Sequence, residues 1–163
     1  MPTETRAKAR RSLLRSGLIV IGLTVAYALL PLRGDLRWLG IGVGVAAIIG
    51  IVPITVRRFH AVRRSEEPVL VALEAIVLLV SMLVLGFAAV YYAMDARQGQ
   101  FEGLVTRVDS VYFTVTTLST VGYGDVHATG TAARVVVTVQ IMLNLAFLGI
   151  VVRVMARAAG AIH

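Results

Sequence analysis

The segment Thr120-Val121-Gly122-Tyr123-Gly124 combines uncharged side chains with a backbone that two glycines make adaptable. Glycine adopts positive φ at little cost, whereas other residues resist it. Glycines at alternate positions therefore allow successive backbone carbonyls to point in one direction. Carbonyl oxygens are good ligands for hard cations. The chemistry that this segment can perform is thus the coordination of an ion by the backbone.

The residues before this segment predict a short helix. Thr106-Arg107-Val108-Asp109 has the pattern of a capping box, with Thr106 as the N-cap. The helix is expected to run for about twelve residues to Ser119, whereas a membrane-spanning helix needs about 20. Irregular backbone at membrane depth is tolerated where it is buried in protein or lines water. The sequence therefore predicts a re-entrant hairpin.

Four apolar runs predict four membrane-spanning helices around this hairpin. They are Gly17–Leu32, Trp38–Val56, Val69–Met94 and Val135–Val152. The composition agrees with this prediction, because 58% of the residues are hydrophobic, compared with about 45–50% in soluble domains. In the second run, the spacing of Gly40 and Gly44 favours close contact with another helix, and plain packing is the simplest interpretation.

The first run has two interpretations. Basic residues precede it and Ala26-Tyr27-Ala28 resembles a cleavage site, as in a secretion signal. We favour a retained helix, since the apolar stretch continues to Leu32. The topology downstream is the same in both cases.

The basic residues indicate how the chain is oriented. All but one of the 16 are Arg, and most lie in short clusters beside the apolar runs, which indicates membrane orientation and not a nucleic-acid-binding surface. The clusters are richest before the first run and between the second and third. The positive-inside rule therefore predicts a multi-pass protein of the cell membrane with both termini in the cytoplasm.

No catalytic or metal-binding constellation is recognisable in the sequence. The chain has no cysteine, and its three histidines are scattered without the spacing of metal ligands. We therefore expect neither an enzyme nor a cofactor.

The hexapeptide TVGYGD at residues 120–125 is identified as a filter motif and resembles the selectivity filter of tetrameric potassium channels. Residues 68–157 resemble the pore domain of that family, with an outer helix, a pore helix, the filter and an inner helix. Together with the two apolar runs that precede this region, the resemblance leads us to expect an all-α integral membrane protein with four transmembrane helices, a re-entrant pore helix and a filter. The resemblance also implies a homotetramer in the lipid bilayer that conducts K⁺ passively.

The expected domains combine this resemblance with the basic cluster and the apolar runs that precede it. Residues 1–16 are a basic cytoplasmic N-terminus, and residues 17–67 hold two N-terminal transmembrane helices and a cytoplasmic loop. Residues 68–157 form the pore domain, and residues 158–163 are a cytoplasmic C-terminus.

The resemblance also assigns roles around the filter. The carbonyls of Thr120, Val121, Gly122 and Tyr123 bind K⁺, with the Thr120 hydroxyl as the innermost ring and Gly124 completing the strand. The side chain of Tyr123 is expected to point away from the axis, towards Phe113 and Tyr112. Asp125 ends the filter at the outer mouth.

Three residues depart from the pattern of the family. Tyr112 stands where many relatives have a tryptophan that bonds the aspartate after the filter, and a phenol can do the same. Thr116 stands where some bacterial channels have a glutamate. Asn144 stands at a frequent hinge glycine, which leaves Gly149 as the candidate hinge of the inner helix.

Three polar side chains have expected places of their own. Asn144 is expected to face the cavity, the alternative being a hydrogen bond with Gln140. His127 is expected at the outer mouth, facing the external solution, where an imidazole gains charge in mild acid. Glu74 is expected near a cytoplasmic arginine, with a role in gating as the alternative.

The apolar runs contain no arginine ladder, so a voltage sensor is not expected. Two other functions stay open from the sequence. The chain could be the pore-forming part of a larger gated assembly with a regulatory subunit, or a membrane adaptor that does not conduct.

Overall fold

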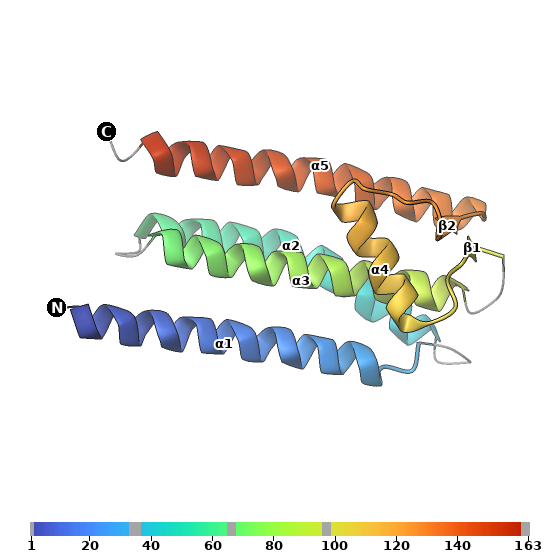
Figure 1. The fold of residues 1–163 in the computed structure, drawn as a ribbon, viewed down its shortest axis with the longest axis horizontal. Coiled ribbons are helices and arrows are strands. Elements are labelled where there is room, and N and C mark those ends of the chain that lie inside the picture. Colours follow the sequence, from blue (N-terminus) through green and yellow to red (C-terminus); the bar gives the residue numbers. More distant parts are fainter. Residues whose placement is uncertain (1, 33–36, 65–67, 96–98, 161–163) are drawn as a thin grey trace.

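The computed structural model describes residues 2–32, 37–64, 68–95 and 99–160, with some of their side chains left out. Its four long helices are α1 (Pro2–Leu29), α2 (Arg37–Arg64), α3 (Pro68–Asp95) and α5 (Thr131–Gly160). The short helix α4 (Arg107–Leu118) lies obliquely beside α3 and α5 (Figure 1). Strands β1 (Phe101–Glu102) and β2 (His127–Ala128) pair antiparallel, with Glu102 opposite His127.

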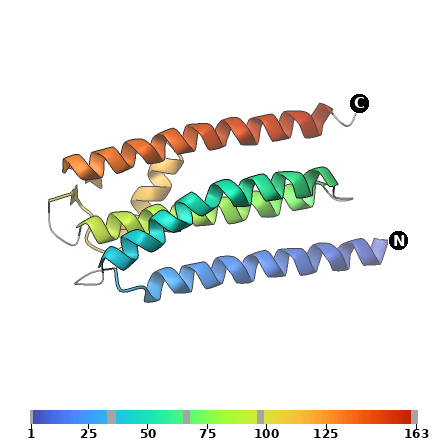
Figure 2. The same ribbon diagram turned by 180° about the vertical axis from the view of Figure 1, so that it is seen from behind.

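The arrangement of the helices puts the predicted filter far from the ends of the chain. Helix α1 begins and helix α5 ends at the same end of the bundle, and α4 and the two strands lie toward the other end (Figures 1 and 2). Helix α3 is central, since α1, α2, α4 and α5 all contact it.

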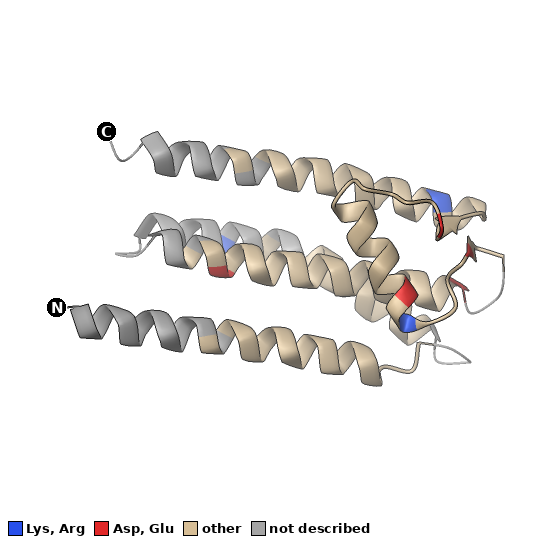
Figure 3. Cartoon of the chain, viewed as in Figure 1, with Lys and Arg blue, Asp and Glu red and all other residues tan. Residues whose placement is uncertain are grey.

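Two stretches of the described residues are long and apolar enough to cross a membrane, Leu73–Asp95 in α3 and Thr131–Gly149 in α5. The apolar stretches of α1 and α2, Ser16–Leu29 and Trp38–Gly50, are shorter. Along the described part of the ribbon, the charged residues are few and leave the central turns of the helices without charge (Figure 3). Because the apolar stretches of α1 and α2 are short, four crossings of the membrane stay a prediction.

Three of the long helices extend by several residues beyond the predicted apolar runs. One is α5, which begins at Thr131 and ends at Gly160. The basic segment predicted as a separate N-terminus is helical from Pro2, and the residues predicted as a loop after Val56 continue α2 to Arg64. Arg, Lys, Ala and Leu are strong helix formers, so a helix that has formed in the apolar run propagates through them. Helix α1 ends at Leu29, before the predicted end, because the residue preceding Pro31 disfavours helical backbone.

Helices α2 and α3 approach closely where both lack a side chain. A methyl group on Gly44 would come within 2.8 Å of the carbonyl oxygen of Gly86. The other glycine of the predicted contact motif, Gly40, lies against Leu32. The small-residue spacing therefore serves packing within one chain, as the simplest interpretation predicted.

An aromatic cluster fixes α4 against α3. The ring centroid of Tyr91 lies 5.8 Å from that of Phe87, 5.2 Å from that of Phe101 and 5.3 Å from that of Phe113. These tilted and edge-to-face contacts are favourable geometries for aromatic rings. The cluster joins α3, β1 and α4 into one core at the end of the bundle that carries the predicted filter.

Candidate functional site

Helix α4 begins with the predicted capping box. The Thr106 Oγ1 accepts a hydrogen bond from the Asp109 backbone N–H at 3.2 Å, and Asp109 Oδ2 accepts from the Thr106 N–H at 2.6 Å. The bond from the Thr106 backbone holds the pKa of the Asp109 carboxyl below its ordinary value, although partial burial opposes this. The helix ends at Leu118 with Ser119 as its C-cap. The predicted start and end of this short helix are confirmed.

The backbone after α4 alternates in handedness. The φ angles of Thr120, Gly122 and Gly124 are +60°, +52° and +84°, while Val121 and Tyr123 do not have positive φ. An extended strand of uniform φ points its carbonyls alternately to both sides, and alternation of handedness turns them to one side. The structure therefore has the backbone pattern that the spacing of the glycines predicted. It places a positive φ on Thr120 as well, the one non-glycine residue with this conformation in the described chain.

Residues 120–124, called the filter segment below, are hydrogen-bonded to the C-terminal end of α4. The Thr116 carbonyl accepts hydrogen bonds from Val121 N–H at 3.0 Å and Gly122 N–H at 3.3 Å. The Thr116 hydroxyl donates to the Phe113 carbonyl at 3.0 Å. Thr116 thus holds the segment through its backbone and needs no carboxylate. The C-terminal end of α4 directs the negative end of its dipole toward the start of the segment.

Tyr112 supports the segment from α4. Its ring stacks on that of Tyr123 with a centroid distance of 6.4 Å and an interplanar angle of 2°. Its hydroxyl donates to Asp125 Oδ2 at 2.8 Å, which confirms the predicted substitute for tryptophan. This hydrogen bond raises the pKa of the Tyr112 phenol.

The structure places Phe113 in the core of the chain. Tyr123 stacks on Tyr112, whereas Phe113 is buried in the aromatic cluster with Tyr91 and Phe101. Residues 112 and 113 lie about 100° apart around a helix, so one of them faces the filter segment while the next faces α3. The role of Phe113 as a support of the filter stays a prediction.

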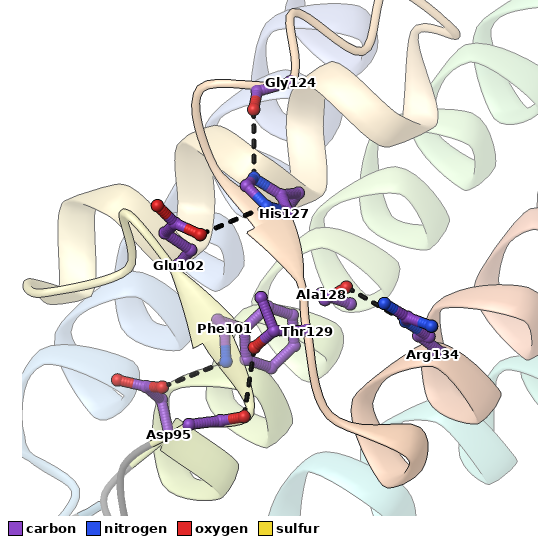
Figure 4. Close-up of polar contacts among 9 residues, drawn as sticks. Asp95, Phe101, Glu102, Gly124, His127, Ala128, Thr129 and Arg134 are labelled. Atoms are coloured by element: carbon purple, nitrogen blue, oxygen red, sulfur yellow. Dashed lines mark hydrogen bonds and ion pairs between the residues drawn. The ribbon is translucent and has the colours of Figure 1, made fainter.

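The loop after the segment is tied to the loop before α4. His127 Nδ1 lies 3.0 Å from the Gly124 carbonyl oxygen, and its Nε2 lies 3.5 Å from the Glu102 carboxylate (Figure 4). The Thr129 hydroxyl donates to the Gly99 carbonyl at 3.0 Å. The side chain of His127 is exposed, as predicted for the outer mouth, but it also bridges β1 and the end of the filter segment.

Asn144 and Gln140 both contact α4 and do not bond to each other. Gln140 accepts a hydrogen bond from the Tyr91 hydroxyl at 2.5 Å and donates to the Thr114 carbonyl at 3.2 Å. Asn144 Nδ2 donates a long hydrogen bond, 3.5 Å, to the Thr117 carbonyl. Asn144 is 8% exposed within the chain, so it lies against α4 and is not the open cavity-facing side chain that was expected. The cause is the spacing of four residues, which puts both amides on one face of α5.

Glu74 is buried on α3. Its predicted pairing with a cytoplasmic arginine falls largely on residues 58–67, whose side chains lie outside the described residues. The pairing and the alternative role in gating both stay predictions.

Two contacts at the site were not foreseen from the sequence. Glu102 is brought to His127 by a two-residue ladder that carries no recognisable pattern. The Arg107 guanidinium donates to the Tyr27 and Leu30 carbonyls at the end of α1. A positive charge at the first residue of a helix is unfavourable for that helix, and this was the available signal that Arg107 has a partner elsewhere.

Comparison with known proteins agrees with this geometry. The family described as "Ion channel" matches residues 79–160, about half of the chain, including α4, the filter segment and all of α5. The chain belongs to this family of potassium-channel pore domains. Its predicted membership is thereby confirmed.

Three curated relatives are similar to parts of the chain. Two pore potassium channel b of Oryza sativa subsp. japonica is 39% identical over 72 residues, which are 44% of this chain and 20% of the relative. Potassium channel AKT2/3 of Arabidopsis thaliana is 45% identical over 38 residues, which are 23% of this chain and 5% of the relative. Potassium channel AKT3 of Oryza sativa subsp. japonica is 53% identical over the same length, 4% of that relative. The chain thus aligns with a fifth or less of their lengths, and no solved structure matches it significantly.

Proposed function

We propose that four copies of this chain assemble around one axis and conduct K⁺ selectively and passively across the cell membrane. The backbone carbonyls of residues 120–123 are the ion ligands, and the Thr120 hydroxyl forms the innermost ring. The observation that carries the proposal is the alternation of positive φ at Thr120, Gly122 and Gly124, at the end of a capped short helix. A row of carbonyls from each of four chains replaces the hydration shell of a dehydrated cation.

The exposed apolar face of α5 supports an assembly. Met142, Leu145 and Leu148 of this helix are 67%, 61% and 58% exposed in one chain. Large apolar faces of this kind are covered by other subunits or by lipid. In a closed ring every copy contributes the same elements to the axis. A filter of four loops, with one loop from each chain, therefore needs four copies.

The tyrosine pair supports selectivity. Stacking of Tyr123 on Tyr112, and the bond from Tyr112 to Asp125, hold the segment from the side opposite the axis. A filter held at a fixed width matches one size of dehydrated cation better than another. The proposal has all four long helices cross the membrane with both termini in the cytoplasm, and it needs no cofactor.

Reconstitution into proteoliposomes tests the proposal. Potassium uptake is measured beside sodium uptake for the wild type, Gly122→Ala and Gly42→Ala. Alanine at position 122 is strained at φ +52°, so we expect loss of K⁺ flux with unchanged membrane insertion. Alanine at Gly42 meets no atom within 4 Å in helix α2, and this matched control should conduct normally.

Normal preference for K⁺ over Na⁺ in the Gly122→Ala protein would contradict the assignment of the filter. Absence of flux through reconstituted wild-type tetramers would favour the adaptor that does not conduct.

A further inference from the structure

The last turn of α1 is held by a residue of α4. Arg107 Nη2 donates to the Leu30 carbonyl at 2.6 Å, and its Nη1 donates to the Tyr27 carbonyl. The final carbonyls of a helix receive no hydrogen bond from an N–H group of the same helix. They also carry the negative end of the helix dipole. One guanidinium therefore caps α1 and offsets that partial charge.

The position of Arg107 in its own helix requires such a partner. It is the first residue of α4, where a positive charge opposes the helix dipole. Its guanidinium carbon also lies 5.8 Å from the ring centroid of Tyr27 and 5.4 Å from that of Tyr92, within the range of cation–π contact. Arg107 is thus placed by α1 and by an aromatic ring of α3, and not by the helix that it begins.

Tyr27 returns a contact from α1 to α4. Its hydroxyl donates to the Arg107 carbonyl at 2.9 Å and lies 2.7 Å from Ser110 Oγ. Tyr27 is 7% exposed and Ser110 is fully buried. Polar groups buried in this way are costly to leave without a partner. The contact therefore has a defined geometry and is not an incidental surface bond.

Helix α4 connects this contact to the filter. Its twelve residues span about 18 Å, and at the other end the Thr116 carbonyl accepts the Val121 and Gly122 N–H groups. A short helix bonded at both ends moves as one body, so a shift at its first turn reaches the filter segment. Tyr27 also lies outside residues 79–160, the part of the chain that the family covers.

We propose that Arg107 and Tyr27 are positioning residues, through which the N-terminal helix α1 sets the place of α4 and thereby the geometry of the filter. This inference rests on the proposed function, because it assigns the extra helix a role in selectivity. Without the contact, α4 is held by α3, α5 and β1, and the filter accommodates cations of more than one size.

Flux ratios and hydrogen exchange test this proposal. Tyr27→Phe removes one hydroxyl, Arg107→Gln removes the charge, and Arg107→Lys keeps the charge but loses the paired bonds. Thr24→Val is the matched control, since the Thr24 hydroxyl bonds only to the Val20 carbonyl one turn earlier in α1. We expect the K⁺-to-Na⁺ flux ratio to fall about threefold to tenfold in Tyr27→Phe and Arg107→Gln, the factor that one hydrogen bond is worth. Arg107→Lys should be intermediate, and Thr24→Val should equal the wild type.

A merely structural role would lower the amount of tetramer and leave this ratio unchanged, and that result overturns the proposal. The rate of hydrogen exchange at the α4 amides gives a second readout that does not depend on conduction. It should rise in Tyr27→Phe and stay unchanged in Thr24→Val. If the wild type does not prefer K⁺, the proposed function fails, and unchanged exchange in both Tyr27→Phe and Arg107→Gln overturns the positioning role by itself.

Discussion

His127 shows how a single side chain joins the outer loops to the filter. Its two ring nitrogens face two acceptors, the Gly124 carbonyl and the Glu102 carboxylate (Figure 4). A neutral imidazole has one N–H and can donate to only one of them, whereas an imidazolium donates to both. The side chain of His127 therefore links β1 to the end of the filter segment, whichever ring nitrogen carries the proton.

Replacement of His127 is expected to loosen the loop that follows the filter segment. His127→Ala removes the contacts with the Gly124 carbonyl and the Glu102 carboxylate, so hydrogen exchange at the amides of residues 124–128 should be faster than in the wild type. Glu102→Gln alters only the second of these contacts and should have a smaller effect. Unchanged exchange in His127→Ala would contradict the role of this side chain as a bridge.

At the scale of the elements, α4 is the part that organises the site. Its first turn is closed by the capping box, and its last carbonyls meet the filter and α5. Helix α5 bonds to it at Thr114 and Thr117 through two amides one turn apart. Helix α4 is thus held by hydrogen bonds at its first turn, to the filter segment and from α5.

Removal of the cap is expected to destabilise the protein. Thr106→Ala should cost about 1 kcal/mol, and Thr106→Ser, which keeps the hydroxyl, should cost much less. The Asp109 pKa is lowered by folding, so its carboxylate stabilises the fold above the ordinary value of 3.8 and loses this effect as the pH falls through the lowered pKa. Thermal unfolding in detergent measures both effects. A penalty for Asp109→Ala that is as large in strong acid as at neutral pH would contradict the role of the charge.

Substitutions on α5 should separate the open probability of the channel from its preference for K⁺ over Na⁺. Gly149 lies where an added methyl group meets no atom within 4 Å, so Gly149→Ala changes helix flexibility without a clash within the chain. We expect it to reduce open probability more than Asn144→Ala does. Asn144→Ala removes a hydrogen bond to α4 and should instead lower the preference for K⁺ over Na⁺. Single-channel recordings report both quantities, and the reverse ranking of open probabilities would move the hinge away from Gly149.

At the scale of the whole molecule, the bundle surrounds one central helix. Helices α1 and α2 pack on α3, while much of α5 is exposed in one chain. The two N-terminal helices therefore lie on the pore domain without arginines in their apolar runs, Gly17–Leu32 and Trp38–Val56.

Open probability is expected to depend only weakly on voltage. Moving one charge through the membrane is worth about 2.3 kcal/mol per 100 mV, and neither apolar run offers a ladder of charges to move. Conductance measured over a range of membrane potentials checks this. A steep curve, comparable to that of channels with arginine-rich sensors, would refute it.

Features that depend on neighbours within a few residues could be predicted from the amino-acid sequence alone. The capping box of Thr106 and Asp109, the alternating glycines and the helical character of the apolar runs follow from local backbone chemistry. The bond from Tyr112 to Asp125 was predicted because the motif of the family places both residues beside the same filter.

Contacts between distant elements became visible only in the folded chain. Tyr27 and Arg107 are 80 residues apart and meet because α1 docks on α3 beside α4. The separation of Tyr112 from Phe113, one on the filter and one in the core, depends on the rotation of α4 about its axis. Such pairings depend on how whole helices pack, and packing is set by side chains from every element at once. A pattern of neighbouring residues does not specify how α4 is rotated about its axis, and it does not specify that Tyr27 contacts Arg107.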